Sequence, residues 1–215
     1  SRVREHLAPP TQHVGFVPSE GPTLGVEVEY GVIDKATGDL AKAAEEVLAI
    51  VGAPFPDGEH PKAKHELFNS SVEVITGICQ TPDDAVADLK GTLLELKPLL
   101  DARGLAMESS GTHPFAVWED LSLSPGERYQ GLVDRIGWPA RRLAIHGVHF
   151  HVGVASKEKA ITFIDSLLNF LPQMLALSTS SPFWMGDDTG LASIRSKIFE
   201  TMPTSGIPPW MADWA

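Results

Sequence analysis

Two segments of the chain alternate, residue by residue, between apolar side chains and acidic or imidazole side chains. Gly25–Tyr30 reads Gly-Val-Glu-Val-Glu-Tyr, and Gly147–Gly153 reads Gly-Val-His-Phe-His-Val-Gly. Successive side chains of a β-strand point to opposite faces, so Glu27 and Glu29 share one face, and the two histidines of the second segment share one face of their own strand. This pattern predicts a sheet with one apolar face that packs against helices and one face that carries carboxylates and imidazoles.

A third segment adds Glu66 and Glu73 to these acidic side chains. Carboxylates that are grouped without a nearby Lys or Arg repel one another when buried, and magnesium relieves this because it prefers oxygen ligands and bridges to phosphates. Glu27 and Glu29 are the first ligand candidates, followed by Glu73 and then Glu66. One straight strand would place residues 66 and 73 on opposite faces, so a bend or bulge at residues 69–71 is required. The alternative is a solvated strand face without a metal.

The paired histidines, His149 and His151, admit a second interpretation. Two histidines at this spacing on a strand are typical of zinc sites in hydrolases, where a carboxylate completes the site. No further ligand follows His151 in an obvious arrangement, so a zinc-dependent hydrolase stays an alternative hypothesis. His113 follows a short predicted strand, and it is either a cleft residue or a turn residue bonded to the backbone.

The remaining periodicities place strands and helices along the chain without a strict βαβ alternation. Strands are predicted at residues 23–34, 64–67, 71–78, 105–110 and 146–154. Helices are predicted at residues 39–51 with Asp39 as the cap, 82–102, 127–136, 157–178 with a bend or break at Pro172, and 191–199. Residues 1–22 carry four prolines and little periodicity, so an extended arm is expected there, with residues 23–215 as one domain. This order favours an α+β fold with an antiparallel sheet.

The composition narrows the classes of function. A net charge of −11 argues against a non-specific nucleic-acid binder, which needs a basic face. The single cysteine, Cys79, excludes an internal disulfide and fits a reducing compartment. No apolar run is expected to reach the roughly 20 residues that span a bilayer, and we therefore expect a cytoplasmic protein without a membrane partner. The sequence contains no phosphate-binding P-loop, no Gly-x-Gly-x-x-Gly fingerprint and no Gly-x-Ser-x-Gly elbow.

Several segments occur together in a characteristic order and spacing. They are Gly25–Asp34, Glu66–Cys79, Ser110–Pro114, Arg128-Tyr129, Gly147–Val154, Leu177–Pro182, and Arg195-Ser196 followed by Pro203–Pro209. With these segments the chain resembles the glutamate–cysteine ligase type 2 family of bacterial carboxylate–amine ligases, which is related in fold to glutamine synthetase. The resemblance implies an antiparallel sheet that is curved into a funnel and backed by helices, with ATP and Mg²⁺ inside. It also implies amide formation, in which ATP phosphorylates a carboxylate and an amine attacks the acyl phosphate.

The resemblance further implies roles for individual residues. The implied metal ligands are Glu27, Glu29, Glu66, Glu73 and His149. The implied catalytic residues are Arg195 and His151, and the implied substrate-binding residues are Thr112, His113 and Arg195, the last of which would hold a carboxylate or the transferring phosphate.

The implied partners are small-molecule substrates, namely an amino-acid carboxylate, for which glutamate is the first candidate, and an amine. Family members typically continue past this length with further strands, an acidic metal ligand and an arginine, so we expect this chain to lack the C-terminal part of the family fold. A non-catalytic subunit, or one completed by a second chain or by a homo-oligomer, is therefore a further hypothesis. We expect weak nucleotide binding and poor turnover from the 215 residues alone.

Overall fold

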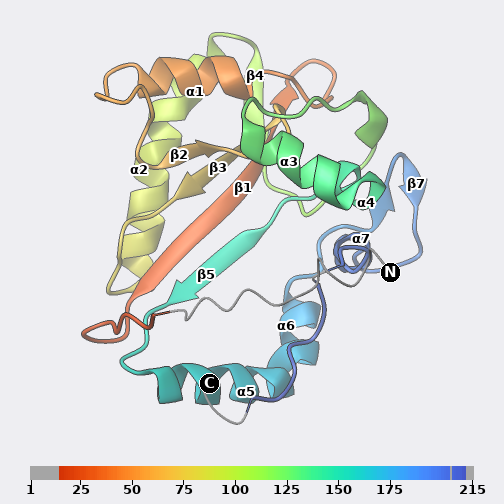
Figure 1. The fold of residues 1–215 in the computed structure, drawn as a ribbon. Coiled ribbons are helices and arrows are strands. Elements are labelled where there is room, and N and C mark those ends of the chain that lie inside the picture. The colour runs from red at the N-terminus through yellow and green to blue at the C-terminus, as the bar shows by residue number, and fades with distance from the viewer. Residues whose placement is uncertain (1–14, 204, 212–215) are drawn as a thin grey trace.

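The computed structural model describes residues 15–203 and 205–211, and its centre is a five-stranded antiparallel sheet (Figure 1). The strands are β1 Leu24–Asp34, β2 Ala63–His65, β3 Ser71–Ile75, β4 Leu105–Glu108 and β5 Val148–Val152. The α-helices are α1 Ala44–Gly52, α2 Pro82–Asp101, α3 Glu127–Ile136, α4 Trp138–Arg141, α5 Lys157–Leu167, α6 Leu171–Leu177 and α7 Arg195–Phe199. The shorter elements are the 3₁₀ turns η1 Trp118–Asp120 and η2 Leu168–Phe170 and the small hairpin β6 Phe183–Trp184 and β7 Asp187–Asp188. This architecture confirms the predicted α+β class with an antiparallel sheet.

The long strand β1 organises the sheet, whose order is β2-β3-β1-β4, with β5 also paired to β1. One edge of β1 pairs with β3. The other edge is shared, because residues 31–34 pair with β4 and residues 24–28 pair with β5. The segments 24–34, 71–75 and 148–152 therefore lie side by side, although more than 35 residues separate the first from the second and more than 70 separate the second from the third. This brings the acidic and histidine segments together.

One face of the sheet is covered by α1 and α2, as the apolar half of each strand predicts. The largest buried cluster joins the sheet to both helices and contains Val32, Ala44, Val47, Leu48, Ala63, Val72, Val74, Leu96, Leu100 and Leu105. A smaller cluster places Val26 and Val28 of β1 against Cys79 and Ala85. A capping box at Thr81 begins α2, and such a box satisfies two backbone N–H groups at the helix start.

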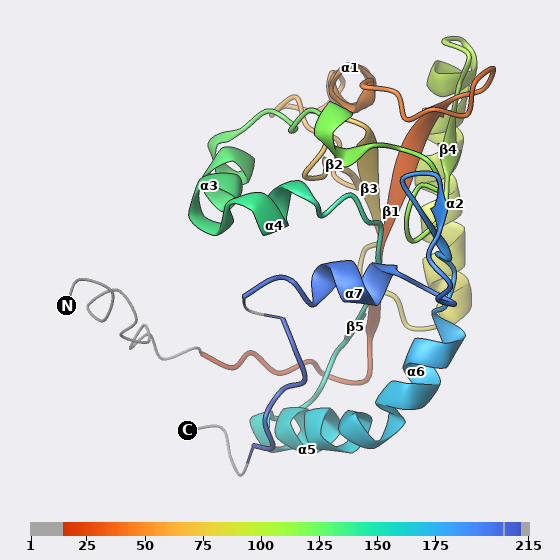
Figure 2. The same cartoon turned by 90° about the vertical axis from the view of Figure 1, so that its right-hand side faces the viewer.

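The opposite face carries α3 and α4, so the two helical layers lie on either side of the sheet (Figure 2). Val133 of α3 and Ala140 of α4 pack on Leu67 and Phe68, which follow β2. The Tyr129 hydroxyl donates a hydrogen bond of 2.6 Å to the carbonyl of the last residue of β2. These contacts hold α3 above the sheet face that bears the carboxylates.

The start of α1 differs from the prediction. Asp39 does not cap this helix; Leu40 instead forms a bridge to Ile33, and α1 begins at Ala44. The first free N–H groups are satisfied from a distant loop, because Asn69 accepts from Ala44 N through its carbonyl and from Glu45 N through its side chain, at 3.0 and 2.7 Å. The loop between β2 and β3 therefore takes the capping role that Asp39 was predicted to have.

The C-terminal helices also correct the sequence analysis. The predicted helix 157–178 is divided, with η2 between α5 and α6. Residues 157–177 are nevertheless long and apolar enough to cross a membrane by length and composition, so the expectation that no run reaches this length is wrong. A single such helix is weak evidence for a membrane span, and the most apolar 18-residue window is 0 % buried here.

The apolar side of β5 is a further correction. Val148, Phe150 and Val152 were expected to pack against helices, but their side chains are exposed, Phe150 by 68 %. The expected N-terminal arm lies largely outside the described residues; its part from residue 15 to residue 22 forms no helix or strand, and Ser19 N donates to Val154 O at 3.0 Å.

Candidate metal and substrate site

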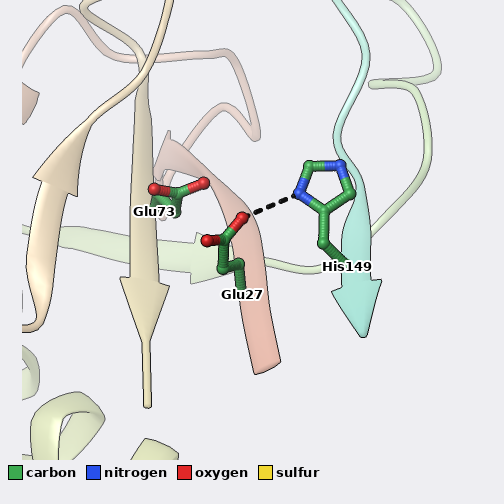
Figure 3. Close-up of side chains that lie close together, drawn as sticks. All are labelled: Glu27, Glu73 and His149. Carbon is green, nitrogen blue, oxygen red and sulfur yellow. Dashed lines mark hydrogen bonds and ion pairs between the residues drawn. The ribbon is translucent and has the colours of Figure 1, made fainter. Parts of the chain in front are cut away.

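The register of the sheet brings the acidic and imidazole side chains onto one face. Glu27 of β1 lies directly opposite His149 of β5, and Glu29 lies opposite Glu73 of β3. Glu27, Glu73 and His149 come from three adjacent strands and lie close together (Figure 3). The alternation in the sequence thus places these groups together, while the valines between them face α2.

Glu27 is held by both histidines of β5. His149 Nδ1 lies 3.1 Å from Glu27 Oε2, and His151 Nε2 lies 3.1 Å from Glu27 Oε1. Burial alone would raise the pKa of Glu27, but the hydrogen bonds to His151 and His149 outweigh it and lower the pKa. Glu27 therefore ionises more readily than an unperturbed glutamate.

Glu73 has the opposite environment. Burial, followed by the charges of Glu66, Glu27 and Glu29, raises the pKa of Glu73 from 4.5 to about 7. Burial and the charge of Glu66 also raise the pKa of Glu29, although Gly147 N donates to its Oε2 at 2.7 Å. These carboxylates lie closer together than their own charges favour, so the site has a deficit of positive charge.

Two overlapping groups of side chains have the spacing of metal ligands. Glu27, Glu73 and His149 offer one ligand atom each within 4.8 Å of one another, and so do Glu29, Glu66 and Glu73. The second group contains only carboxylates, which suit a hard cation such as Mg²⁺. Because Glu73 belongs to both groups, and because burial together with its acidic neighbours raises its pKa, the residues fit bound cations.

Glu66 reaches this face because the chain reverses after β2. The strand ends at His65 and β3 begins at Ser71, with a turn between them. The seven-residue offset between Glu66 and Glu73 therefore spans a turn, which is the bend that the sequence analysis required at residues 69–71.

Arg195 of α7 enters the site from the far side of β5. Its Nε donates to the carbonyl of His146 at 2.7 Å. Its positive charge partly offsets the burial that raises the pKa of the nearby Glu29. A Cβ atom at Gly147 would lie 2.9 Å from Arg195 Nη2 and 3.2 Å from His149 Nε2. A side chain at this position would have to displace the end of the Arg195 side chain, so Gly147 favours this close approach, a feature that the sequence analysis missed.

Thr112 and His113 lie away from this cluster. Thr112 donates to the carbonyl of Phe183 at 3.0 Å. His113 is buried; its Nε2 lies 2.8 Å from the carbonyl of Gly38, and its Nδ1 accepts from Ala116 N at 3.0 Å. A substrate-binding role for Thr112 and His113 stays a prediction that these contacts do not support.

Two cavities are lined by both the acidic face and α3. One has a volume of about 400 Å³ and is lined by Glu29, Glu66, His149, Arg195 and residues of α3. The other has a volume of about 830 Å³ and includes Glu27, Glu73 and His65. Arg128 and Tyr129 of α3 line both cavities. The sequence analysis quoted this pair only as part of a motif and gave it no role.

Comparisons with known proteins point to one family. The family model "Glutamate-cysteine ligase family 2" matches residues 23–215. A protein of Thermobifida fusca that carries the name glutamate–cysteine ligase 2 is 42 % identical over 201 residues, which are 94 % of this chain and 50 % of the relative. A similarly named protein of Frankia alni is 44 % identical over 201 residues, which are 94 % of this chain and 53 % of the relative. The chain spans about half the length of these curated relatives.

A solved structure supports the fold. The crystal structure of a glutamate–cysteine ligase from Francisella tularensis in complex with AMP aligns with a TM-score of 0.50 at 17 % identity, covering 74 % of this chain and 34 % of that one. At this identity the similarity concerns the arrangement of helices and strands.

Proposed function

The chain belongs to the glutamate–cysteine ligase 2 family, and on this premise we propose that it forms the nucleotide and metal site of an ATP-dependent carboxylate–amine ligase. The observation that carries the proposal is the acidic face of the sheet, where Glu73 joins two groups of potential ligand atoms that each lie within 4.8 Å. The proposed cofactor is Mg²⁺, and the proposed substrates are ATP, an amino-acid carboxylate with glutamate as the first candidate, and an amine.

The proposed metal ligands are Glu27, Glu29, Glu66, Glu73 and His149. Magnesium bound there would neutralise phosphoryl oxygens and align the attacking group with the leaving group. The raised pKa of Glu73 supports this assignment, since burial and the neighbouring carboxylates together disfavour its negative charge. A bound cation would offset that cost.

The proposed reaction has two steps. A carboxylate oxygen of the substrate attacks the γ-phosphorus of ATP, so that an acyl phosphate forms and ADP leaves. The amine nitrogen then attacks the acyl carbon, the C–O bond to phosphate breaks and the amine loses a proton. Arg195 is proposed to bind the carboxylate or the transferring phosphoryl group, because its fork suits bidentate binding of oxyanions. His151 is the proposed acceptor of the proton, since its Nε2 lies beside Glu27 at 3.1 Å.

The zinc hydrolase hypothesis gains no support from the geometry. In the described part of the chain, the metal-ligand groups contain His149 but not His151. Both imidazoles contact the same carboxylate instead of a shared open centre.

We also propose that further polypeptide completes the site beside β5, either as a continuation or as a second chain. All five residues of β5 are exposed, and the chain spans about half the length of its relatives. Supplying the C-terminal half of a full-length relative should slow amide exchange at β5, and Phe150→Asp should prevent this. Ile78→Asp is the matched control, because Ile78 is also an exposed apolar residue but lies away from β5. Unchanged exchange at β5 in the complex would count against this interface.

The site itself is tested by Glu27→Gln. Calorimetry with a non-hydrolysable ATP analogue, with and without Mg²⁺, should show that the variant loses the Mg²⁺-dependent part of the affinity while circular dichroism stays unchanged. Glu20→Gln is the control, because Glu20 is exposed and lies outside the site. An unchanged Mg²⁺-dependent affinity in Glu27→Gln would refute Glu27 as a ligand.

A further inference from the structure

One face of α3 forms a wall of the 400 Å³ cavity. Arg128, Leu132 and Arg135 line the cavity from positions i, i+4 and i+7 of the helix, and residues at this spacing lie along one helical face. Opposite them, the sheet side of the cavity presents Glu29 and Glu66. The cavity is therefore bipolar, with carboxylates below and guanidinium groups above.

Two contacts fix α3, which carries Arg128 and Arg135, to the sheet. The hydroxyl of Tyr129, next to Arg128, donates to the carbonyl of His65 at 2.6 Å. Val133, between the two arginines, is buried against Leu67 and Phe68. Because the helix is tied to the sheet at both positions, the two guanidinium groups can reach the cavity without a rearrangement of the backbone.

Among the described residues, these guanidinium groups have no carboxylate partner. Within residues 15–203 and 205–211, no ion pair involves Arg128, Arg135 or Arg195, whereas Arg103 pairs with Glu46 at 2.8 Å. Arg128 lies 5.7 Å from the centre of the Tyr129 ring, and Arg195 uses Nε for the carbonyl of His146. In a chain with 28 acidic and 17 basic residues, three arginines that line one cavity without a carboxylate partner are available to bind an external anion.

We propose that Arg128 and Arg135 form, with Arg195, an oxyanion-binding wall that orients the substrate above the metal site. Their seven-residue separation corresponds to about 10 Å along the helix axis, at about 1.5 Å per residue. This length exceeds one carboxylate or phosphate, so the wall suits a ligand with more than one anionic group. Arginine binds such groups bidentately, which fixes orientation as well as charge.

The bipolar cavity also limits what the ligand is. A simple anion would be repelled by Glu29 and Glu66, while a ligand with both signs of charge meets a partner on each side. Two ligands have this chemistry: an amino acid, with its ammonium group toward the sheet, and a phosphate chain, with its metal ion toward the sheet. Both present oxyanions to α3, and binding measurements can distinguish them. The inference deepens the proposed function because it names the residues that select the anionic substrate.

The test measures anion binding by the whole chain at low ionic strength, without turnover. Glutamate and pyrophosphate, the latter with and without Mg²⁺, are titrated into the unsubstituted chain, into the double variant Arg128→Gln/Arg135→Gln and into Arg141→Gln. Arg141 is exposed on α4 and does not line the cavity, so it is the matched control. The double variant should bind at least about tenfold more weakly, a loss that corresponds to about 1.4 kcal/mol, because it removes two charged groups that would donate to the oxyanions.

The titrations with glutamate and with pyrophosphate distinguish a carboxylate from a phosphate as the bound oxyanion. A loss for glutamate alone supports a carboxylate at the wall, a loss for pyrophosphate alone supports phosphate, and a loss for both supports a wall that spans the two. Equal affinities in the double variant and the control, or no binding of either anion by the unsubstituted chain, overturn the proposal. Arg128→Lys keeps the charge but loses the fork, and it should give an intermediate affinity.

A parallel measurement keeps the metal site separate. Mn²⁺ binding followed by electron paramagnetic resonance reports on Glu27, Glu73 and His149 and should be unchanged in the double variant. If the substitutions do not weaken anion binding while Mn²⁺ binds, the proposed oxyanion-binding wall is refuted and the proposed metal site is unaffected. If Mn²⁺ does not bind to the unsubstituted chain, the proposed function fails irrespective of the arginines.

Discussion

Replacing Glu73 with glutamine should stabilise the metal-free protein, but only at pH values at which the glutamate would otherwise be ionised. In the fold, burial and the charges of Glu66, Glu27 and Glu29 raise the pKa of Glu73 from 4.5 to about 7. The folded state therefore holds this proton more tightly than the unfolded state does. Ionising Glu73 costs nothing in stability below pH 4.5, costs progressively more as the pH rises from 4.5 to 7, and costs the full amount above pH 7.

The size of this cost follows from the difference between the two pKa values. The pKa difference between 4.5 and about 7 corresponds to about 3 kcal/mol, because each pH unit of difference corresponds to about 1.4 kcal/mol. Because Glu73 is only partly buried, solvent screens the repulsion, and about 1–2 kcal/mol is the better expectation. Glutamine has a similar shape and no charge, so Glu73→Gln removes the cost without opening a cavity.

Urea denaturation at pH 4.5 and pH 8 measures the effect. Glu73→Gln should increase the free energy of unfolding by about 1–2 kcal/mol at pH 8 and leave it nearly unchanged at pH 4.5. Added Mg²⁺ should stabilise the unsubstituted chain at pH 8 and narrow the difference, because the cation offsets the same repulsion. Glu20→Gln is the exposed control. Equal stabilities of the variant and the unsubstituted chain at pH 8, or a larger gain at pH 4.5, would refute the repulsion argument.

Three substitutions test the framework by urea denaturation at pH 7. Leu96→Ala should cost about 2–5 kcal/mol, because Leu96 is 1 % exposed in the main core; a loss below about 1 kcal/mol would mean that this core is loosely packed. Thr81→Ala removes the cap of α2 and should cost about 1 kcal/mol. An unchanged stability would contradict the role of the capping box. Tyr129→Phe removes the 2.6 Å bond to His65 and should cost about 0.5–1.5 kcal/mol; it should also weaken anion binding, and unchanged binding would show that α3 keeps its position without this bond.

The sequence predicts the acidic face well because strand alternation is a local property. Glu27 and Glu29 share a face wherever β1 is placed, and the same holds for His149 and His151. Their meeting across strands needed the additional inference that these segments pair, which the shared antiparallel sheet confirms. The family motifs carried that inference, since no local pattern specifies which strand pairs with which.

Other features depend on contacts between distant residues, and local patterns do not encode these. Asn69 caps α1 from outside the helix, so the search for a cap just before the periodic segment selected Asp39. For His113 the sequence left open a cleft residue or a turn residue bonded to the backbone; the contact of its ring with the carbonyl of Gly38 fits the second alternative, although this partner lies 75 residues away. Arg128 was quoted only within a motif and Arg135 was not considered, and it is the fold that places both of them around one cavity with Glu66.

The prediction that the apolar side of β5 packs against helices was wrong for a different reason. Alternation predicts that Val148 and Phe150 share an apolar face, and they do, but it does not reveal whether any element covers that face. Here α2 covers the neighbouring valines of β1 and does not extend over β5. The prediction of packing therefore required knowledge of how far a helix reaches across the sheet.

The two faces of β1 explain how the chain tolerates a cluster of like charges. The same strand that carries Glu27 and Glu29 buries Val26, Val28 and Val32 on its other face. Each buried valine contributes about 1.5–3 kcal/mol, which exceeds the repulsion of about 1–2 kcal/mol expected at Glu73. Packing on α2 therefore holds the carboxylates at a spacing that their charges oppose, which is what the proposed cation site requires. A change that loosens the α2 side should consequently let the carboxylates separate and weaken cation binding, although it touches no ligand.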